Sequence, residues 1–400
     1  MLYIAPGNAG TAQCGKNISI DITDFDAIGK FCISEKIEMI IVGPEEPLVR
    51  GLNDHFKSTK ELEQIYFIGP SKNGARLEGS KAFAKAFMQR HNIPTAKYQE
   101  FDASNFEDGV HYVKEHPLPV VLKADGLAAG KGVIICQTSV EAVSEFELMI
   151  QKSKFGDASK KVVVEEFLNG IELSMFVLTD GENYLLLPEA KDYKRIGEGD
   201  TGLNTGGMGA VSPVPFATPG FMHKVEQKII KPTIAGLHKE QIDYTGFLFF
   251  GLISVNDEPY LIEYNCRMGD PETEVVLPRL ETDLVELLVA ATKRDLDSVK
   301  LKVDKRNAVT VMAVSQGYPG TYEKGFEIMG LNTQPDKESF IFHAGTKQTN
   351  GKTVTNGGRV LCVTSYGNNI REAVEHSLIV LEDINFDGIF YRTDIGYEFK

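Results

Sequence analysis

The chain has 400 residues, of which 42% are hydrophobic and 24% charged, as in globular proteins built from two or three domains. Its formal charge of -14 argues against a broad surface for nucleic-acid phosphates, although a basic pocket could still hold a phosphorylated small molecule. The five cysteines show no CxxC spacing, which argues against a disulfide framework and the common zinc sites. No stretch approaches the roughly 20 apolar residues of a membrane span. We therefore expect a cytoplasmic protein that handles small metabolites, with no nucleic-acid or membrane partner.

The first eighty residues alternate between short apolar runs, Gly/Pro loops and helical patterns. This alternation predicts a parallel, Rossmann-like α/β sheet, with strands at 2–5, 39–42 and 65–68 and a helix at 24–36. Ligands of such sheets bind at the carboxyl ends of the strands, so the loops that follow these strands are candidate ligand loops. A helix at 81–91, followed by Pro94, marks a candidate boundary.

From about residue 118 the pattern changes to antiparallel strand pairs, and from 306 to a smaller, mainly β unit. We expect domains at 1–78, 79–305 (with a mobile lid at about 97–168) and 306–400. The central strands are expected at 119–123, 133–137, 161–167, 173–179, 183–187, 247–255 and 259–264, with helices at 139–152, 219–239 and 283–293 and a long loop at 191–213. The last unit should contain strands at 308–314, 339–343 and 358–363 and a helix at 370–383.

The segment YLIEYNCRMGDPETE (260–274) is the most informative part of the chain. In a strand, Glu263, Asn265 and Arg267 would project from one face, because side chains alternate with a period of two. A carboxylate and an amide oxygen suit Mg²⁺, and a guanidinium beside them suits a carboxylate or phosphate. The alternative interpretation is a strand end with a salt bridge and a polar turn.

A glycine-rich loop joins the two strands expected in PVVLKADGLAAGKGVIIC (119–136). Lys123 ends the first strand and Lys131 lies in the loop, where both could neutralise phosphates. Gly126 and Gly130 are separated by three residues and a strand follows, so neither the spacing nor the context fits a P-loop. The segment is typical of a flap over nucleotide phosphates; the alternative is a plain hairpin with two solvated lysines.

Two further segments gain meaning beside this loop. The strand expected at 161–167 leads through Glu165 and Glu166 to Glu172, and it suits adenine and ribose recognition, although alone it would be simple core. The glycine-rich loop 191–213 carries Asp192 and Asn204, and its length favours a functional loop over a disordered one.

Together these segments resemble the ATP-grasp superfamily and, within it, the phosphoribosylamine–glycine ligase family, also called glycinamide ribonucleotide synthetases. The resemblance rests on APGNAGT (5–11), VGPEEPLVRG (42–51), LEGSKAF (77–83), KADGLAAGKGV (123–133), EEFLNG (165–170), DTGLNTGGMGAVSP (200–213), EYNCRMGDPETE (263–274), HAGTK (343–347) and TNGGRVL (355–361). It implies ATP-dependent ligation of glycine to 5-phosphoribosylamine through glycyl phosphate, in de novo purine synthesis.

The resemblance also implies roles for individual residues. ATP phosphates would be bound by Lys81, Lys123 and Lys131, and the nucleoside by Glu165, by the backbones of Glu166 and Leu168, and by Glu172 on the ribose. Mg²⁺ or Mn²⁺ would be held by Glu263 and Asn265, and glycine by Arg267 and Asp192, with Lys131 as the third catalytic residue. Phosphoribosylamine would lie near Gly7, Asn8, Pro44, Glu45, Asn356, Gly357 and Arg359, and Asn204 is a further substrate-binding candidate.

In one respect the chain departs from the family pattern. Family members normally begin about two dozen residues earlier, with a strand and a glycine-rich loop whose helix N-terminus suits a phosphate. The resemblance therefore implies that the first βα unit is missing. Two alternative functions follow: an impaired nucleotide-binding form, or another ATP-grasp carboxylate–amine ligase. We expect a monomer or a weak homodimer.

Overall fold

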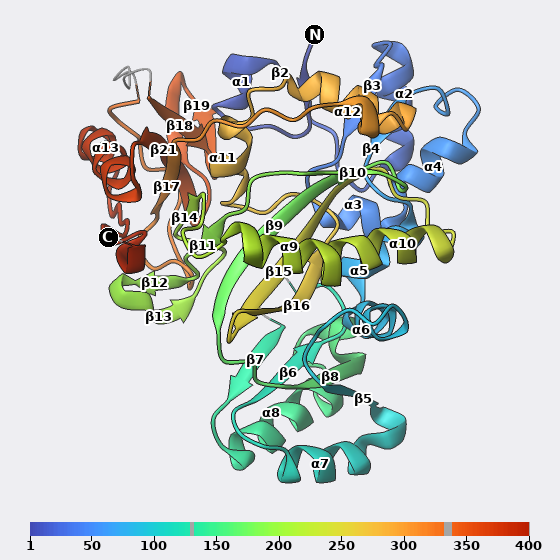
Figure 1. Cartoon of the computed structure of the whole chain (residues 1–400). Coiled ribbons are helices and arrows are strands. Elements are labelled where there is room, and N and C mark those ends of the chain that lie inside the picture. The colour runs from blue at the N-terminus through green and yellow to red at the C-terminus, as the bar shows by residue number, and fades with distance from the viewer. Residues whose placement is uncertain (129–131, 332–337, 400) are drawn as a thin grey trace.

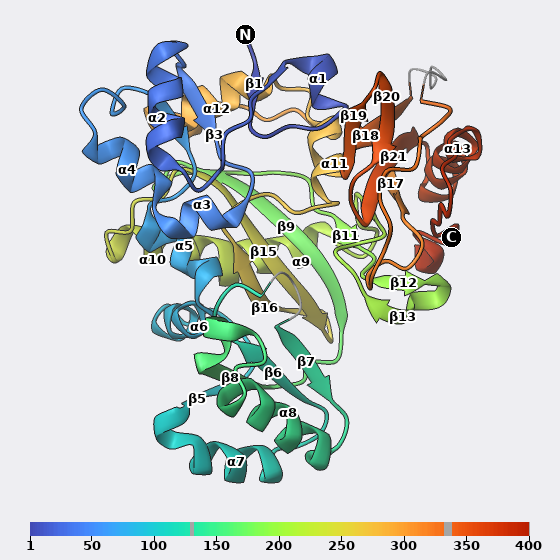
Figure 2. The same ribbon diagram turned by 180° about the vertical axis from the view of Figure 1, so that it is seen from behind.

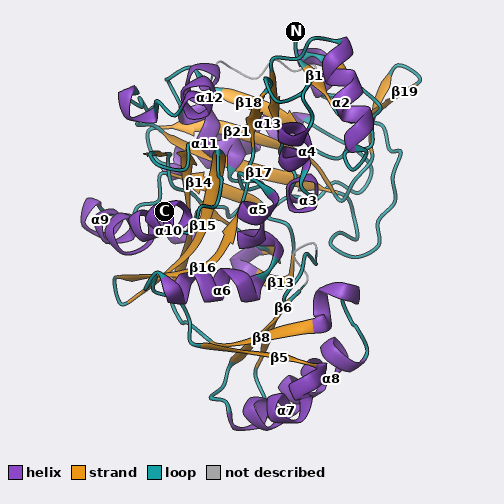
Figure 3. Cartoon of the chain, turned by 90° about the vertical axis from the view of Figure 1, so that its right-hand side faces the viewer, coloured by secondary structure: helices purple, strands orange, loops and turns teal. Residues whose placement is uncertain are grey.

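A computed structural model describes residues 1–128, 132–331 and 338–399. Figure 1 shows the N-terminal unit and the C-terminal unit on either side of a central sheet, and a separate lid sheet beyond the far end of that sheet. Figure 2 gives the view from behind, and Figure 3 shows from the side that the lid and its two helices project from the rest of the molecule. No helix in the described part of the chain is both long and apolar enough to cross a membrane.

The N-terminal unit contains parallel strands, as the sequence predicts, but they form two separate pairs. Strand β1 (Tyr3–Ile4) pairs with β2 (Lys16–Asn17), and β3 (Met39–Ile41) pairs with β4 (Tyr66–Ile68). The helices are α1 (Thr11–Cys14), α2 (Phe25–Ser34), α3 (Glu45–Arg50), α4 (Leu52–Ser58) and α5 (Lys72–Gly79). The Asp24 side chain caps α2 by accepting a hydrogen bond from the N–H of Ala27, which explains where this helix begins.

The central sheet is antiparallel, with the order β10 (Tyr184–Leu186), β9 (Ile171–Thr179), β15 (Gly246–Val255) and β16 (Glu258–Asn265). Asn256 and Asp257 have φ angles of 52° and 62°, the positive values that a two-residue hairpin turn between β15 and β16 requires. Helices α9 (Pro219–Val225) and α10 (Lys231–Lys239), joined by one π-helical turn (Glu226–Ile230), pack on the sheet. Helices α6 (Lys81–Arg90), α11 (Thr273–Val276) and α12 (Leu284–Lys293) complete this part.

The lid is a four-stranded antiparallel sheet covered by helices on one side only. Its order is β5 (Tyr98–Asp102), β8 (Lys161–Glu166), β6 (Val120–Ala124) and β7 (Val133–Cys136). Helices α7 (Phe106–Glu115) and α8 (Ser139–Gln151) pack against it through a buried cluster that includes Phe101 and Phe146. These helices lie on the side away from the central sheet, so the other lid face is turned toward it (Figure 1).

The prediction of a long loop at 191–213 is wrong, because two segments of it are strands of the C-terminal sheet. Strands β11 (Lys191–Asp192) and β14 (Gly209–Ser212) join β17 (Asn307–Val314), β21 (Arg359–Gly367) and β18 (Ser339–His343) in one sheet. The glycines concealed these strands, but Ala210 and Val211 are fully buried, so burial in a partner sheet outweighs low strand propensity. This sheet therefore crosses the predicted boundary near residue 305. Helix α13 (Ile370–Asp383) covers it, and β19 (Thr346–Thr349) pairs with β20 (Lys352–Thr355).

Between β11 and β14, the chain forms a hairpin of β12 (Arg195–Gly197) and β13 (Thr201–Asn204). Short 3-10 turns occur at Ala103–Asn105, Gly156–Lys160, Glu198–Asp200, Leu277–Arg279, Leu296–Ser298 and Tyr397–Phe399.

Arg392 anchors the β12–β13 hairpin: its fully buried guanidinium lies 2.7 Å from Asp394 Oδ1 and 2.7 Å from Asp200 Oδ1.

We expect Arg392→Leu to lower the free energy of unfolding by about 3 kcal/mol, because two carboxylates lose a desolvated partner. Urea unfolding followed by circular dichroism measures this change. The matched control is Arg371→Leu, since Arg371 pairs with Glu375 on an exposed helix face, where a pair contributes about 0.5 kcal/mol or less. Equal losses in the two variants would contradict the anchoring role.

Candidate active site between the lid and the central sheet

A β-bulge near the end of β16 determines where Glu263 points. Gly251 pairs with Glu263 but Leu252 pairs with Leu261, so Ile262 is an extra residue in the strand. Leu261 and Tyr264 both lie in the central core although they are three residues apart, because the bulge shifts the alternation of the strand. Glu263 therefore emerges on the face opposite Tyr264, and Asn265 follows two residues later on the face of Glu263.

Glu263 is paired with a lysine from a different motif. Lys81 Nζ, at the start of α6, lies 2.8 Å from Glu263 Oε2. Burial opposes ionisation of Glu263, but Lys81 and Lys123 outweigh it and lower the pKa of this carboxyl to about 2. Burial also opposes the charge on Lys81, yet Glu263 raises its pKa above the usual value. Both groups are therefore charged at neutral pH.

Lys123, on lid strand β6, contacts the central strand that carries Glu263. Its Nζ lies 2.9 Å from Glu165 Oε2 and donates to the carbonyl of Ile262, the bulged residue, at 3.4 Å. The sequence motifs around Lys123 and Glu263 are thus neighbours in space, as the nucleotide-site hypothesis requires. Lys131 lies outside the described residues.

The adenine and ribose candidates lie where the lid meets the central sheet. Glu166 ends β8 and accepts a hydrogen bond from the N–H of Lys97 at 2.8 Å, and Leu168 lies in the following loop. Glu172 is the second residue of β9, and its Oε2 atom lies 2.5 Å from Lys194 Nζ. The same ammonium lies 3.0 Å from Asp192 Oδ1, so Lys194 joins the ribose candidate to a glycine candidate.

Arg267 lies just beyond β16 and is held by two carboxylates. Its guanidinium is 2.9 Å from Glu78 Oε1 and 3.2 Å from Glu45 Oε2. Glu78 is buried, and its second oxygen accepts the backbone N–H of Cys266 at 2.8 Å. Glu45 follows Pro44 at the start of α3, so Arg267 connects the metal motif to the N-terminal unit.

Some of the candidates for phosphoribosylamine lie where the N-terminal and C-terminal units meet. Asn8 Nδ2 donates to the carbonyls of His343 and Ala344, at 2.7 and 3.1 Å. Gly7 has φ +75°, and a Cβ there would lie 2.2 Å from the Asn17 side chain, so this turn requires glycine.

On the C-terminal side, the backbone N–H of Asn356 donates to Gly345, and the carbonyl of Gly357 accepts from Ser315 Oγ. Arg359 Nη1 reaches Asp270 Oδ1 at 2.9 Å and the carbonyl of Gly206 at 2.8 Å. Asn204 pairs with Arg195 in the exposed β12–β13 hairpin.

Two carboxyl groups in the segment 260–274, those of Glu272 and Glu274, have raised pKa values. Burial and then Asp192 raise the pKa of Glu272 to about 7, and Ser174 Oγ donates to Glu272 Oε1 at 2.8 Å. Burial and then Asp270 raise the pKa of Glu274 to about 8, and its Oε2 atom is buried without a hydrogen-bond partner. Neither residue was assigned a role from the sequence, since burial of a carboxyl has no local signal.

We expect the free energy of unfolding to fall as the pH rises from about 5 to 7, because native Glu272 binds its proton more tightly than the unfolded chain does. The cost above pH 7 is on the order of 3 kcal/mol for this group. Glu272→Gln should therefore match the parent protein at pH 5 and exceed its stability at pH 8, as urea unfolding at a series of pH values will show. Glu147→Gln, on the exposed side of α8, is the control. An unchanged pH slope in Glu272→Gln would contradict this assignment.

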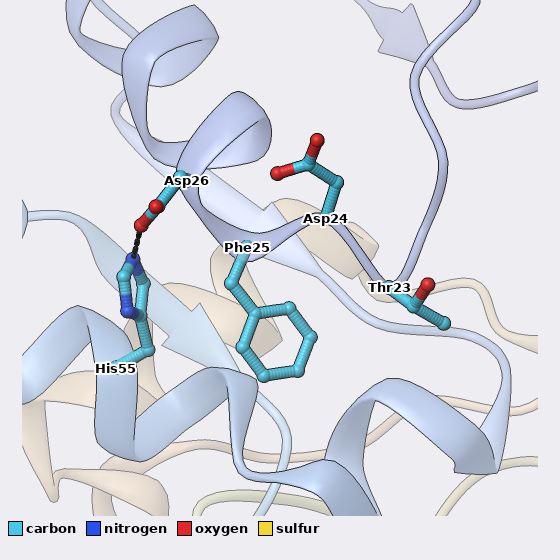
Figure 4. Close-up of a pocket in the computed structure, with 5 residues that line it drawn as sticks. All are labelled: Thr23, Asp24, Phe25, Asp26 and His55. Atoms are coloured by element: carbon cyan, nitrogen blue, oxygen red, sulfur yellow. Dashed lines mark ion pairs between the residues drawn. The ribbon is translucent and has the colours of Figure 1, made fainter.

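Two surface hollows lined by described residues lie away from these groups. One, of about 550 Å³, is lined by Thr23, Asp24, Phe25, Asp26 and His55 (Figure 4). The other is lined by Glu182, Tyr184, Lys231, Ile234, Ala235 and His238. Neither contains a residue predicted for the site, so the charged cluster between lid and sheet carries the functional argument.

A one-sided lid sheet that brings Lys123 beside the pair of Lys81 on α6 and Glu263 on the central sheet suits an ATP-grasp ligase, a class that uses ATP and a divalent metal ion. Models of the phosphoribosylglycinamide synthetase N domain, ATP-grasp (A) domain and C domain match residues 1–78, 79–273 and 308–398. The chain belongs to the phosphoribosylglycinamide synthetase family.

Individual relatives agree with this membership. The phosphoribosylamine–glycine ligase of Vibrio cholerae serotype O1 is 48% identical over 399 residues, covering 99% of this chain and 92% of that protein. The crystal structure of phosphoribosylamine–glycine ligase from Thermotoga maritima is similar with a TM-score of 0.83 and 35% identity, covering 98% of this chain and 93% of that one. The biotin carboxylase domain of Hydrogenobacter thermophilus 2-oxoglutarate carboxylase, with a TM-score of 0.71 and 19% identity over 95% of this chain and 82% of that one, shares the fold.

Proposed function

We propose that this chain ligates glycine to 5-phosphoribosylamine at the expense of ATP, through a glycyl phosphate, and releases glycinamide ribonucleotide, ADP and phosphate. The observation that carries the proposal is the cluster in which Lys81, Glu263 and Lys123 come together from three separate motifs. Membership of the family whose named relatives are phosphoribosylamine–glycine ligases supports the choice of substrates.

A carboxylate is a poor electrophile until one of its oxygens becomes a phosphate leaving group. In the first step, a glycine oxygen attacks the terminal phosphorus of ATP, the bond to the bridging oxygen breaks, and ADP leaves. Lys81 and Lys123 are placed to neutralise the phosphate oxygens, and Lys131 is the third candidate for this role. Arg267 and Asp192 are the candidates that orient the carboxylate and the amine of glycine.

In the second step, the amine of phosphoribosylamine attacks the glycyl carbonyl, the amine nitrogen loses a proton as the amide forms, and phosphate leaves with the bonding electrons. The candidates for binding this substrate are Gly7, Asn8, Pro44, Glu45, Asn356, Gly357 and Arg359, with Asn204 as a further substrate-binding candidate. Glycyl phosphate hydrolyses easily, so the lid would also serve the reaction by excluding water.

The residues present fit a hard divalent cation. Glu263 is an ionised carboxylate and Asn265 supplies an amide oxygen, which are the donor types that Mg²⁺ and Mn²⁺ accept together with nucleotide phosphates. No cluster of three or more His, Cys, Asp or Glu side chains suited to a metal occurs within the described residues. A metal bound by Glu263 and Asn265 would add positive charge to the phosphates.

The test is ADP release measured with ATP alone, with each second substrate, and with both. We expect sustained turnover only with glycine and phosphoribosylamine together. Glycine labelled with ¹⁸O in its carboxylate should transfer one label to the released phosphate, because the acyl phosphate carries that oxygen. Unlabelled phosphate, or equal turnover with another carboxylate, would contradict the proposal. ATP binding without turnover would favour the alternative of an impaired nucleotide-binding form.

A monomer or a weak homodimer is the expected solution state, which analytical ultracentrifugation can test.

A further inference from the structure

Lys85 is a buried cation that none of the roles above uses. It lies on α6, one helical turn after Lys81, and only 2% of its side chain is exposed. Its ammonium donates to Thr95 Oγ1 at 2.7 Å and lies 3.1 Å from Glu165 Oε2. Because desolvating an ammonium is costly, such a lysine persists only where its partners compensate for the lost water.

The carboxylate of Glu165 is shared between two ammonium groups. Its Oε2 atom lies 3.1 Å from Lys85 Nζ, on helix α6, and 2.9 Å from Lys123 Nζ, on strand β6 of the lid. One negative charge thus faces two positive charges, all three side chains being almost fully buried. These three groups carry a net charge of about +1, and the adjacent Lys81–Glu263 pair adds no net charge, so the cluster favours the arrival of an anion.

Hydrogen bonds connect both lysines of this cluster to strand β16 of the central sheet. Thr95 Oγ1, which accepts from Lys85, donates in turn to the carbonyl of Leu261 at 2.6 Å. Lys123 donates to the next carbonyl along β16, that of Ile262. Lys85 and Lys123 are therefore anchored on adjacent residues of the bulged strand, one residue before Glu263.

We propose that Lys85 is a positioning residue for the nucleotide: it shares the charge of Glu165 and so leaves the Lys123 ammonium with net positive charge for an ATP phosphate. This inference rests on the proposed ATP site. Without Lys85, Glu165 would pair with Lys123 alone and neutralise it. Burial lowers the pKa of Lys85 to about 8, against the opposing effect of Glu165, so the group is still mainly charged at pH 7.

The test compares Lys85→Met with the double variant Lys85→Met/Glu165→Gln. We expect Lys85→Met to weaken ATP and ADP binding by about tenfold or more in isothermal titration, while adenosine binding stays within about twofold. The double variant should regain most of this loss, because the carboxylate that over-neutralises Lys123 is also gone. Lys154→Met, which removes a lysine paired with Glu145 on the lid surface, should bind like the parent protein.

A merely structural role predicts a different pattern. Lys85→Met would then lose affinity for adenosine and ATP alike, and the double variant would be weaker than either single one; that result would overturn the inference. Unchanged ATP affinity in Lys85→Met would overturn it too, while leaving the proposed function intact if the parent protein still turns over. Failure of the parent protein to bind ATP would remove both.

Discussion

Glu263→Gln should lower kcat by about 10³-fold, the largest effect expected from any single substitution in the site. The change keeps the shape of the side chain but removes the negative charge that pairs with Lys81 at 2.8 Å. It also weakens the oxygen donor proposed for the metal, so the Mg²⁺ concentration for half-maximal activity should rise with the fall in kcat. Initial rates of ADP release over a Mg²⁺ titration measure both quantities.

The control for this prediction lies on the same strand. Glu258 begins β16 and pairs with Lys224 and Lys228 at the surface, at 3.1 and 2.5 Å. Glu258→Gln should leave kcat and the Mg²⁺ dependence unchanged, since exposed pairs contribute little. A Glu263→Gln protein with the parental Mg²⁺ dependence would show that the metal assignment is wrong, even if its kcat were reduced.

Arg267→Lys should raise the KM for glycine by about 100-fold, with a smaller effect on the KM for ATP. Lysine keeps the charge but loses the planar fork whose Nε now contacts Glu45 and whose Nη2 contacts Glu78. Glu78 would be left buried with fewer donors, and the remaining ammonium cannot bind a carboxylate bidentately. Initial rates with each substrate varied in turn will separate the three KM values.

A surface arginine provides the matched comparison. Arg90 makes a two-pronged contact with Glu240, at 2.8 and 2.9 Å, at the end of α6. Arg90→Lys loses the same fork geometry outside the site, so its KM for glycine should stay within about twofold. If Arg267→Lys changed the KM for ATP more than that for glycine, Arg267 would belong to the nucleotide instead.

Much of the fold follows from local sequence patterns. The strands at β3, β4, β6, β7 and β17 and the helices α2, α6, α8 and α13 lie within a few residues of their predicted positions. The β15–β16 hairpin was predicted from Asn256 and Asp257, whose positive φ values match their type. Such features depend on residues near one another in the chain, which is why periodicity and turn chemistry reveal them. The missed strand β14 depends instead on distant β17, and the missed strand β11 pairs with β14.

For the site, the sequence by itself determined which residue types are present: the lysines, the carboxylates and the arginine, in motifs that resemble one family. Only the tertiary structure decided how they meet. The bulge at Ile262 turns Glu263 out of the core, Lys85 and Lys123 share Glu165, and Glu78 holds Arg267. The physical reason is that burial and Coulomb interactions depend on distance in space, and these partners are separated by 42 to 189 residues along the chain.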